Sequence, residues 1–255
     1  MIPLELSVIE PLGKLIARPW ADVVTGMQVD SRRIDEGDLF VAVGGGEDFI
    51  EHAFARGASA TLVPTDDFAA LAAIAGAVRD RSNARVVGIT GSTGKTSTKD
   101  ILFALCAPHR RTIANEGNYN TEIGVPLTIC RIEEDTELCI SELGMRGMGQ
   151  IAWLASFVRP DVGVITNIGP AHLEFLGSIE NIARAKAELI DALRHHRQAC
   201  RGQHAVAVRD ELHVEAPAAE HTHRDRRRAS PRDPAAGNVE RRVLEVPRGG
   251  AAAAG

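Results

Sequence analysis

The sequence has little of what marks secreted, membrane-spanning or nucleic-acid-binding proteins. Its four cysteines include no Cys-x-x-Cys pair, which favours reduced thiols over a disulfide framework. The first residues contain no basic head followed by an apolar run, and no uncharged apolar stretch is long enough to cross a bilayer. The net charge of -5 disfavours a general nucleic-acid binder. We therefore expect a cytoplasmic protein with no membrane span and no nucleic-acid partner.

Lysine is also scarce, because it supplies only four of the 29 lysine and arginine residues. Each lysine is therefore a candidate for a specific role: Lys14, Lys95, Lys99 and Lys186. At 255 residues the chain is long enough for one large or two small domains, each with a core.

A glycine-rich turn between a predicted strand and a predicted helix is the strongest pattern. The apolar run 86–89 predicts a buried parallel strand, and residues 96–106 predict a helix that stops before Pro108. Between them the chain reads Gly91-Ser92-Thr93-Gly94-Lys95-Thr96. Because backbone N–H groups converge on an anion at such a helix N-terminus, this order predicts a phosphate-binding loop.

The chemistry of that loop is carried by its last two residues. Lys95 would reach the terminal phosphates of a nucleotide, and the Thr96 hydroxyl would hold Mg²⁺. The common pattern has a glycine where Ile89 stands. A glycine turn with a surface lysine is the alternative, and the strand and helix on either side disfavour it.

Residues 1–82 predict a small α/β domain. Residues 39–43 and 59–63 favour strands, whereas 48–56 and 66–81 favour helices. At the end of an earlier strand, the serine and arginine of Asp30-Ser31-Arg32 suit a uracil edge or a diphosphate. Taken alone, a surface turn with an ordinary ion pair explains this tripeptide better.

Residues 83–194 alternate strand and helix, which predicts a mostly parallel sheet with helices on both faces. Ligands of such sheets bind at the carboxyl ends of the strands. Three further strand ends are therefore candidates: the polar loop 115–126, Glu142 after strand 138–142, and His172 after strand 162–168. In a P-loop sheet, an acid at the strand end where Glu142 stands meets Mg²⁺. Each stretch on its own also fits an ordinary polar loop.

Lys186 falls on the apolar face of a predicted helix that follows Ser178. An amine there must reach solvent along its stem, find a partner or lose its proton. A neutral amine can take up CO₂ and become a carbamate, an anion that ligates metal. From the spacing alone, reaching solvent is favoured.

Residues 195–255 change in character. Arginine, alanine, proline and glycine dominate without periodicity, so we expect a disordered or loosely packed, low-complexity tail. A basic tail that binds nucleic acid and a frame-shifted end are both open alternatives.

Four stretches of the chain resemble the Mur ligase family, in the family's order, over about residues 26–193. They are Asp30-Ser31-Arg32 with residues 37–42, residues 88–100, residues 118–126, and residues 142–145 with 166–174 and 185–188. Several ordered blocks are far more specific than one motif. The forms of the glycine loop and of residues 167–172 favour the branch that adds D-alanyl-D-alanine.

The resemblance implies an ATP-dependent peptide ligase. ATP would phosphorylate the terminal carboxylate of a UDP-N-acetylmuramoyl-tripeptide, and the amine of D-alanyl-D-alanine would attack the acyl phosphate, releasing phosphate. The residues implied to bind ATP are Gly91, Ser92, Thr93, Gly94, Lys95, Thr96 and Ser97. The residues implied to be catalytic are Lys95, His172 and Lys186.

Two Mg²⁺ ions are implied as well. Thr96 and Glu142 would bind one ion, and His172 with carbamylated Lys186 would help bind the second. The resemblance thus reverses the preference, based on spacing alone, for a Lys186 side chain that reaches solvent. The implied substrate contacts are Ser31 and Arg32 at the UDP end, with Asn120 and Thr121 in the substrate-side loop.

Two departures from the family pattern affect these expectations. The family has an Asp-Gly-His stretch where this chain has Gly44-Gly45-Gly46-Glu47-Asp48, so the uridine pocket is expected to be incomplete. The family's C-terminal ligase domain is not recognisable in residues 195–255. We therefore expect a monomeric ligase fragment, with domains at 1–82 and 83–194 and with little or no ligation activity.

Three other functions stay open. A P-loop switch GTPase would need an Asn-Lys-x-Asp motif, and Thr166-Asn167-Ile168-Gly169 supplies only the asparagine. A second possibility is a protein that binds a UDP-linked peptide without chemistry. A third is a sibling Mur ligase that adds a diamino acid or glutamate.

Overall fold

The computed structural model describes residues 1–171, 173–197 and 204–207. All of them belong to one compact unit, Met1–Leu212, and a second unit, His213–Gly255, lies outside the described residues. His172 and nearly all of the predicted tail are therefore outside the described residues as well.

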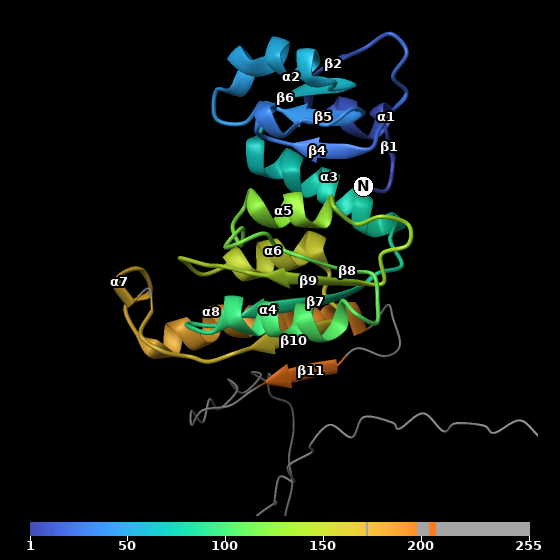
Figure 1. Ribbon diagram of the computed structural model, residues 1–255. Helices are drawn as coiled ribbons and strands as arrows, with labels where there is room; N and C mark the ends of the chain where they lie inside the picture. The colour runs from blue at the N-terminus through green and yellow to red at the C-terminus, as the bar shows by residue number, and fades with distance from the viewer. Residues whose placement is uncertain (172, 198–203, 208–255) are drawn as a thin grey trace, which may run out of the picture. The chain divides into compact units, whose positions relative to one another are not determined.

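A five-stranded parallel sheet lies in the lower part of Figure 1, in the order β11-β10-β7-β9-β8. Its strands are β7 (Arg85–Thr90), β8 (Thr112–Ala114), β9 (Leu138–Glu142), β10 (Val162–Ile165) and β11 (His204–Ala207). Nearly every residue of β7 and β9 is buried, because both faces of the parallel sheet are covered.

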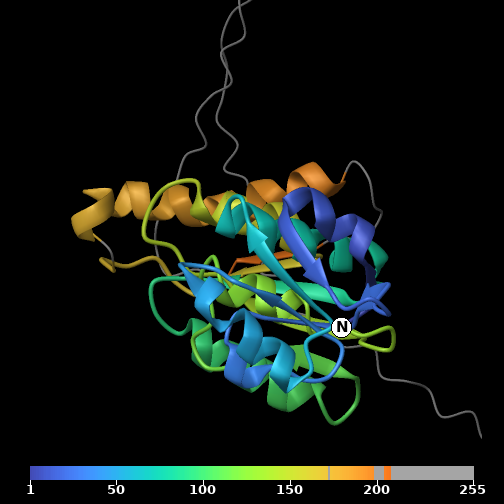
Figure 2. The same cartoon turned by 90° about the horizontal axis from the view of Figure 1, so that it is seen from above.

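Helices cover both faces of this sheet, as Figure 2 shows from above. On one face α4 (Lys95–Cys106) packs against β7, β8 and β9. On the other, α6 (Gln150–Val158) and α8 (Ile179–Arg197) pack against each other, and α8 also contacts β7 and β10. The predicted α/β class, with a mostly parallel sheet between helices, is confirmed.

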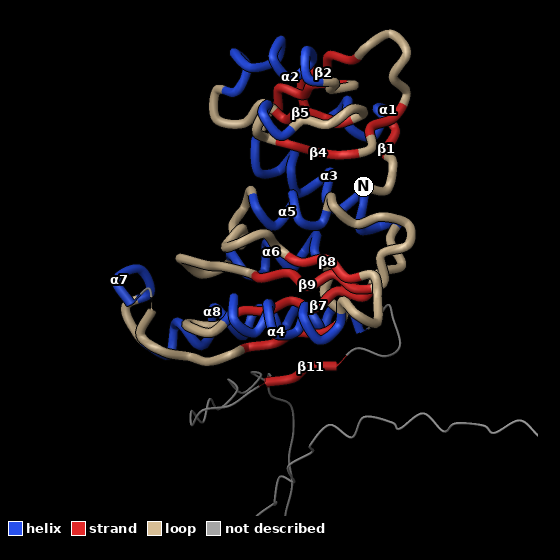
Figure 3. Tube along the Cα trace, in the orientation of Figure 1, coloured by secondary structure: helices blue, strands red, loops and turns tan. Residues whose placement is uncertain are grey.

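The strands end at a common rim. Because β7, β9 and β10 are parallel neighbours, the loops that follow them leave the sheet at the same end (Figure 3). Those loops lead into α4, α6 and the short helix α7 (Leu173–Leu176). This rim is where the sequence predicts ligands.

The N-terminal residues build a second sheet in the order β2-β6-β5-β4, in which only β2 is antiparallel to its neighbour. Its strands are β2 (Gly13–Ala17), β4 (Gly26–Gln28), β5 (Asp38–Val41) and β6 (Ala60–Pro64). A two-stranded ribbon pairs β1 (Leu4–Glu5) with β3 (Val23–Val24). The helices are α1 (Leu6–Ile9), η1 (Glu10–Leu12), η2 (Ser31–Arg33), η3 (Gly46–Phe49), α2 (Ile50–Arg56) and α3 (Asp67–Arg81).

Local capping explains where the predicted helices begin and end. The Asp66 carboxylate accepts the Ala69 N–H at 2.9 Å and starts α3, and the Ser178 hydroxyl accepts the Asn181 N–H at 3.2 Å before α8. Gly57 ends α2 in the left-handed region, with φ +115°.

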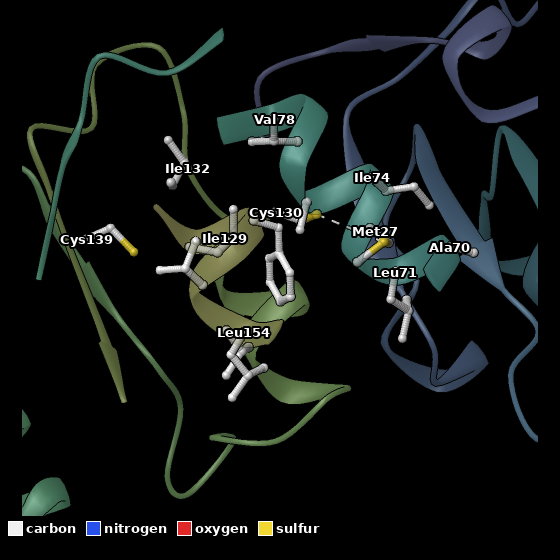
Figure 4. Close-up of a cluster of buried hydrophobic side chains, with 14 of the residues drawn as sticks. Met27, Ala70, Leu71, Ile74, Val78, Ile129, Cys130, Ile132, Cys139 and Leu154 are labelled. Atoms are coloured by element: carbon white, nitrogen blue, oxygen red, sulfur yellow. Dashed lines mark hydrogen bonds between the residues drawn. The ribbon is translucent and has the colours of Figure 1, made fainter. Parts of the chain in front are cut away.

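A shared hydrophobic core joins α3 to the central residues (Figure 4). Leu71, Ile74 and Val78 of α3 lie in one cluster with Ile129 of α5 (Gly124–Ile129) and Leu154 of α6, and all five are at most 1 % exposed. The proposed domain division at residues 82 and 83 stays a prediction.

The structure corrects three predictions of detail. The tail was expected to be unstructured from residue 195, but α8 runs to Arg197 and β11 pairs with β10 because the sheet edge supplies its hydrogen bonds. Helix 48–56 begins as the 3-10 turn η3. The loop 115–126 ends early, because α5 begins at Gly124.

Candidate active site

The glycine turn joins β7 to α4 at the rim, as the sequence predicts. Gly91 and Gly94 have φ values of +154° and +79°, which glycine adopts without strain. A Cβ at Gly91 would lie 1.9 Å from the Thr166 Oγ1, so no larger residue fits there. Because α4 begins at this turn, the N–H groups of its first turn are directed at the rim.

The exit of β10 holds the turn in shape. The Asn167 side chain accepts the Thr93 N–H at 2.8 Å and donates to the Thr93 Oγ1 at 2.7 Å. The Ser92 Oγ accepts the Gly169 N–H at 2.9 Å, and the Thr166 Oγ1 donates to the Thr93 carbonyl at 2.6 Å. Asn167 thus positions the phosphate loop, a role that the sequence alone does not reveal.

Glu142 lies beside this loop because of the strand register, which sets it opposite Ile89. Its Oε2 accepts the Thr96 hydroxyl at 2.9 Å, and its Oε1 accepts the Asn120 amide at 2.7 Å. Glu142 is only 1 % exposed, so the alternative of a solvated loop acid is wrong. Among the described residues no lysine or arginine forms an ion pair with this buried carboxyl group.

The oxygen donors of Thr96 and Glu142 fit a Mg²⁺ ion. Mg²⁺ prefers hydroxyl and carboxylate oxygens, and it usually takes only one or two carboxylates together with substrate phosphates and waters. Within the described part of the chain, no group of three histidine, cysteine or acidic residues gathers that could hold a metal ion. The arrangement therefore suits a metal ion that arrives with a nucleotide.

Lys186 of α8 is buried at the same rim. It is 1 % exposed, so the solvent-reaching stem that spacing alone favours is wrong. Burial, together with the charge of Lys95, lowers the pKa of Lys186 to about 8. The described residues give its amine no hydrogen bond or ion pair. A buried lysine without a partner is disposed to lose its proton.

A cleft of about 410 Å³ brings the predicted residues together. It is lined by Gly91, Lys95, Asn120, Thr121 and Lys186, among others. The Lys95 ammonium donates to the Gly91 carbonyl at 2.8 Å. The Lys95 ammonium and the turn of the phosphate loop therefore face the same space as the Lys186 amine, and the ammonium and the loop favour a polyanion.

The structure describes Ser97 but not His172. Ser97 is exposed on the first turn of α4. His172, which the resemblance assigns to catalysis and metal binding, lies outside the described residues.

The N-terminal candidates line a second cleft, of about 880 Å³, with Gly44, Gly45 and Gly46 on one wall. Ser31 is buried and its hydroxyl lies 2.9 Å from the Nδ1 of His52, a residue that the sequence did not single out. Arg32 pairs with Asp30 at 2.8 Å, and this contact lowers the pKa of the Asp30 carboxyl to about 2. The ion pair expected for a plain surface turn is therefore present.

A third cleft, of about 370 Å³, links the other two. It shares Val29 and Asp30 with the N-terminal cleft, and Thr121 and Ile123 with the phosphate-loop cleft. Ser31 and Lys95 therefore line different clefts, and the third cleft shares residues with both of these clefts.

Comparison with known proteins agrees with this geometry. The model of the Mur ligase middle domain matches residues 89–238, which is more than half of the chain. The chain belongs to the Mur ligase family. This match extends beyond residue 193, the end of the resemblance recognised in the sequence.

Its relatives include peptide ligases of this family. The chain is 38% identical over 209 residues to the UDP-N-acetylmuramoyl-tripeptide–D-alanyl-D-alanine ligase of Bacillus subtilis, covering 74% of this chain and 46% of the relative. It is 37% identical to the ligase of that name from Escherichia coli, covering 68% and 41%. The chain thus spans less than half the length of these Mur ligases.

Solved Mur ligase structures share the fold. A crystal structure of MurF from Acinetobacter baumannii aligns with a TM-score of 0.67 at 27% identity, covering 80% of this chain and 48% of that one. MurF from Thermotoga maritima in complex with ADP aligns with a TM-score of 0.61 at 34% identity, covering 72% and 45%.

In the described part of this Mur ligase chain, no helix is both long and apolar enough to cross a membrane.

Proposed function

We propose that this chain supplies the substrate and ATP sites of a ligase that joins D-alanyl-D-alanine to a UDP-N-acetylmuramoyl-tripeptide. The observation that carries the proposal is the single cleft lined by both Lys95 of the phosphate loop and the buried Lys186. A nucleotide switch needs only the first lysine, whereas a reaction between two anions also gains from a second metal ion, which a carbamate on Lys186 would help to hold.

The reaction joins two substrates in two steps and cleaves ATP to ADP and phosphate. A carboxylate oxygen of the peptide attacks the γ-phosphorus of ATP, the bond to the bridging oxygen breaks, and ADP leaves. The amine of D-alanyl-D-alanine then attacks the acyl carbon, loses a proton, and expels phosphate. Because both reactants of the first step are anions, the site must neutralise charge and hold them in line.

The chain's residues divide this work. The N–H groups of residues 94–97 and the Lys95 ammonium bind the phosphates, and residues 91–93 shape the turn. Thr96 and Glu142 would hold Mg²⁺, which supplies further charge neutralisation when bound. Lys186 reacts as the neutral amine with CO₂, forming a carbamate and releasing a proton. With His172, this carbamate would help to hold a second Mg²⁺ ion.

The series of clefts suits an extended substrate. Ser31 and Arg32 bind the UDP end, and Asn120 and Thr121 hold the part that enters the phosphate-loop cleft. The third cleft, which shares residues with both, accommodates the sugar and peptide between them. The relatives described above favour the D-alanyl-D-alanine branch over the glutamate-adding or diamino-acid-adding branches.

Trapping the acyl phosphate tests this function. The chain, ATP, Mg²⁺ and the UDP-tripeptide are mixed with hydroxylamine, and the hydroxamate of the peptide is measured by mass spectrometry. We expect an ATP-dependent hydroxamate that is lost in Lys95→Met. A protein that only binds would take up the UDP-tripeptide without ADP formation, and a switch GTPase would hydrolyse GTP without the peptide. Either result contradicts the proposal.

Amide formation is a separate question. Replacing hydroxylamine with D-alanyl-D-alanine tests whether the chain completes ligation. Weak or absent amide product stays our prediction, and full turnover with the amide confirmed by mass would refute it.

A further inference from the structure

Lys99 is a buried lysine that the proposed chemistry leaves unused. It lies on α4 three residues after Thr96 and is 3 % exposed. Its ammonium donates to the Asn115 carbonyl at 2.9 Å and to the Gly117 carbonyl at 3.0 Å, and it pairs with the Asp100 Oδ1 at 3.1 Å. Two of the three N–H donors of the ammonium therefore have a carbonyl acceptor, and Asp100 adds an ion pair.

Both carbonyls belong to the loop 115–123, which joins β8 to α5 at the rim. The Asn115 side chain ties this loop to Glu142, the proposed Mg²⁺ ligand, because its Oδ1 accepts the Glu142 backbone N–H at 2.5 Å. Its amide also donates to the Tyr119 carbonyl at 2.5 Å, which closes the loop on itself. From the same loop, Asn120 donates to the Glu142 Oε1.

These contacts form a closed network around Glu142. Thr96 and Lys99 lie one turn apart on the same side of α4. Thr96 holds one oxygen of Glu142, while Lys99 holds the loop whose Asn120 holds the other oxygen. Without the Lys99 ammonium, both carbonyls would lose a charged donor, and that of the buried Asn115 would lose it away from solvent.

We propose that Lys99 is a positioning residue for the metal site. By fastening the loop 115–123 to α4, it keeps Asn120 against Glu142 and so fixes the direction in which the carboxylate presents its oxygens to Mg²⁺. Lys99 does not touch the nucleotide itself. This inference rests on the proposed function, and outer partners of metal ligands commonly change metal affinity by about 10- to 100-fold.

Four variants separate positioning from general stability. Lys99→Met keeps the stem and removes the donors, whereas Lys99→Arg keeps the charge and the donors. Asp100→Asn removes the ion pair and leaves both carbonyl contacts. Lys14→Met is the matched control, because Lys14 is an exposed lysine on β2 of the N-terminal sheet.

Hydrogen–deuterium exchange without nucleotide tests the fastening itself. Peptides covering residues 115–123 are expected to exchange about tenfold faster in Lys99→Met than in the unchanged chain or in Lys14→Met. Equal exchange would overturn the proposal. If Lys99→Met does not fold, Lys99→Gln takes its place, since its amide reaches one carbonyl.

The Mg²⁺ dependence of ADP binding, measured by calorimetry, tests the consequence. In Lys99→Met the Mg²⁺ concentration for half-maximal enhancement is expected to rise about tenfold, while ADP affinity without Mg²⁺ stays within about twofold. Lys99→Arg should recover part of the effect, and Asp100→Asn should resemble the unchanged chain. An unchanged Mg²⁺ dependence, or an equal loss with and without Mg²⁺, would overturn the proposal.

The two measurements also distinguish this inference from the proposed function. If the unchanged chain binds no ADP with Mg²⁺, the proposed function fails, and the exchange rates still decide whether Lys99 fastens the loop. If the unchanged chain binds Mg²⁺ and ADP but Lys99→Met matches it, only the role of Lys99 is refuted.

Discussion

At the scale of single residues, burial changes the chemistry of Lys186. Its amine is 1 % exposed, and the nearest charge that acts on its pKa is the positive charge of Lys95. Both effects disfavour the protonated form, which explains why the pKa falls. The sequence could predict that Lys186 lies on an apolar face, but not that the face closes completely over it.

The titration of Lys186 gives a first prediction. Its folded pKa of about 8 lies below the ordinary 10.5, so the folded chain binds fewer protons than the unfolded chain between these values. This group therefore makes folding more favourable as the pH rises through that window. With ¹³C-bicarbonate at fixed dissolved CO₂, a carbamate carbon signal should grow as the pH rises through about 8. Lys186→Ala should lack the signal, and its absence from the unchanged chain would contradict carbamate formation.

Glu142 gives a second prediction. In Glu142→Gln the shape is kept and the charge is lost, so ADP binding with Mg²⁺ should weaken about tenfold, or about 1.4 kcal/mol. Binding without Mg²⁺ should be unchanged by calorimetry. The control is Glu116→Gln, which removes a half-exposed carboxylate that pairs with Arg33 at 2.8 Å. A loss of the same size in both variants would speak against a metal role for Glu142.

At the scale of elements, local signals predicted α3, α4 and α8, because caps and apolar spacing lie within each helix. The short strands β1, β2 and β3 were missed, since a strand of a few residues exists only through partners distant in sequence. The same reason hid β11, which depends on the edge of β10.

The network around Glu142 was hidden for a related reason. Asn115 and Glu142 are 27 residues apart, and only the sheet brings them together. The sequence named both stretches as strand ends but could not pair their side chains. The scarcity of lysine was the one signal that drew notice to Lys99 before the structure.

The turn between β7 and α4 gives a third prediction. In Gly91→Ala the new Cβ would meet the Thr166 Oγ1 at 1.9 Å, so the loop must move away from β10. We expect ADP affinity to fall more than about tenfold and the free energy of unfolding to drop by about 1–3 kcal/mol. The control is Gly45→Ala, where φ is +85° but nothing lies within 4 Å of the new Cβ. It should lose stability and keep ADP binding; if both variants bind alike, the close approach at Gly91 is unimportant.

At the scale of the whole described unit, α3 connects the N-terminal residues to the central sheet. Arg79 of α3 donates to the Val158 carbonyl at 3.1 Å and pairs with Asp161 at 3.2 Å. Asp161 in turn accepts the Val86 N–H at 2.8 Å, at the start of β7. The guanidinium therefore adds directional contacts to the shared apolar core.

Removing this guanidinium gives a fourth prediction. Arg79→Met leaves Asp161 without its cation, and we expect a loss of about 2–4 kcal/mol in the free energy of unfolding, measured in urea. The exposed Arg111, which pairs with Asp135 at 2.8 Å, is the control, and Arg111→Met should change stability by less than about 0.5 kcal/mol. Similar losses in both would mean that the α3 connection contributes no special stability.

The central claim is that the rim formed by β7, β9 and β10 is a Mg²⁺–nucleotide site. Calorimetry with ADP and Mg²⁺ tests it most directly, using the unchanged chain, Lys95→Met, and GDP as the competing nucleotide. We predict saturable ADP binding that is strengthened by Mg²⁺, preferred over GDP, and lost in Lys95→Met. An unchanged chain that binds neither nucleotide, or that binds ADP equally well after Lys95→Met, would contradict it.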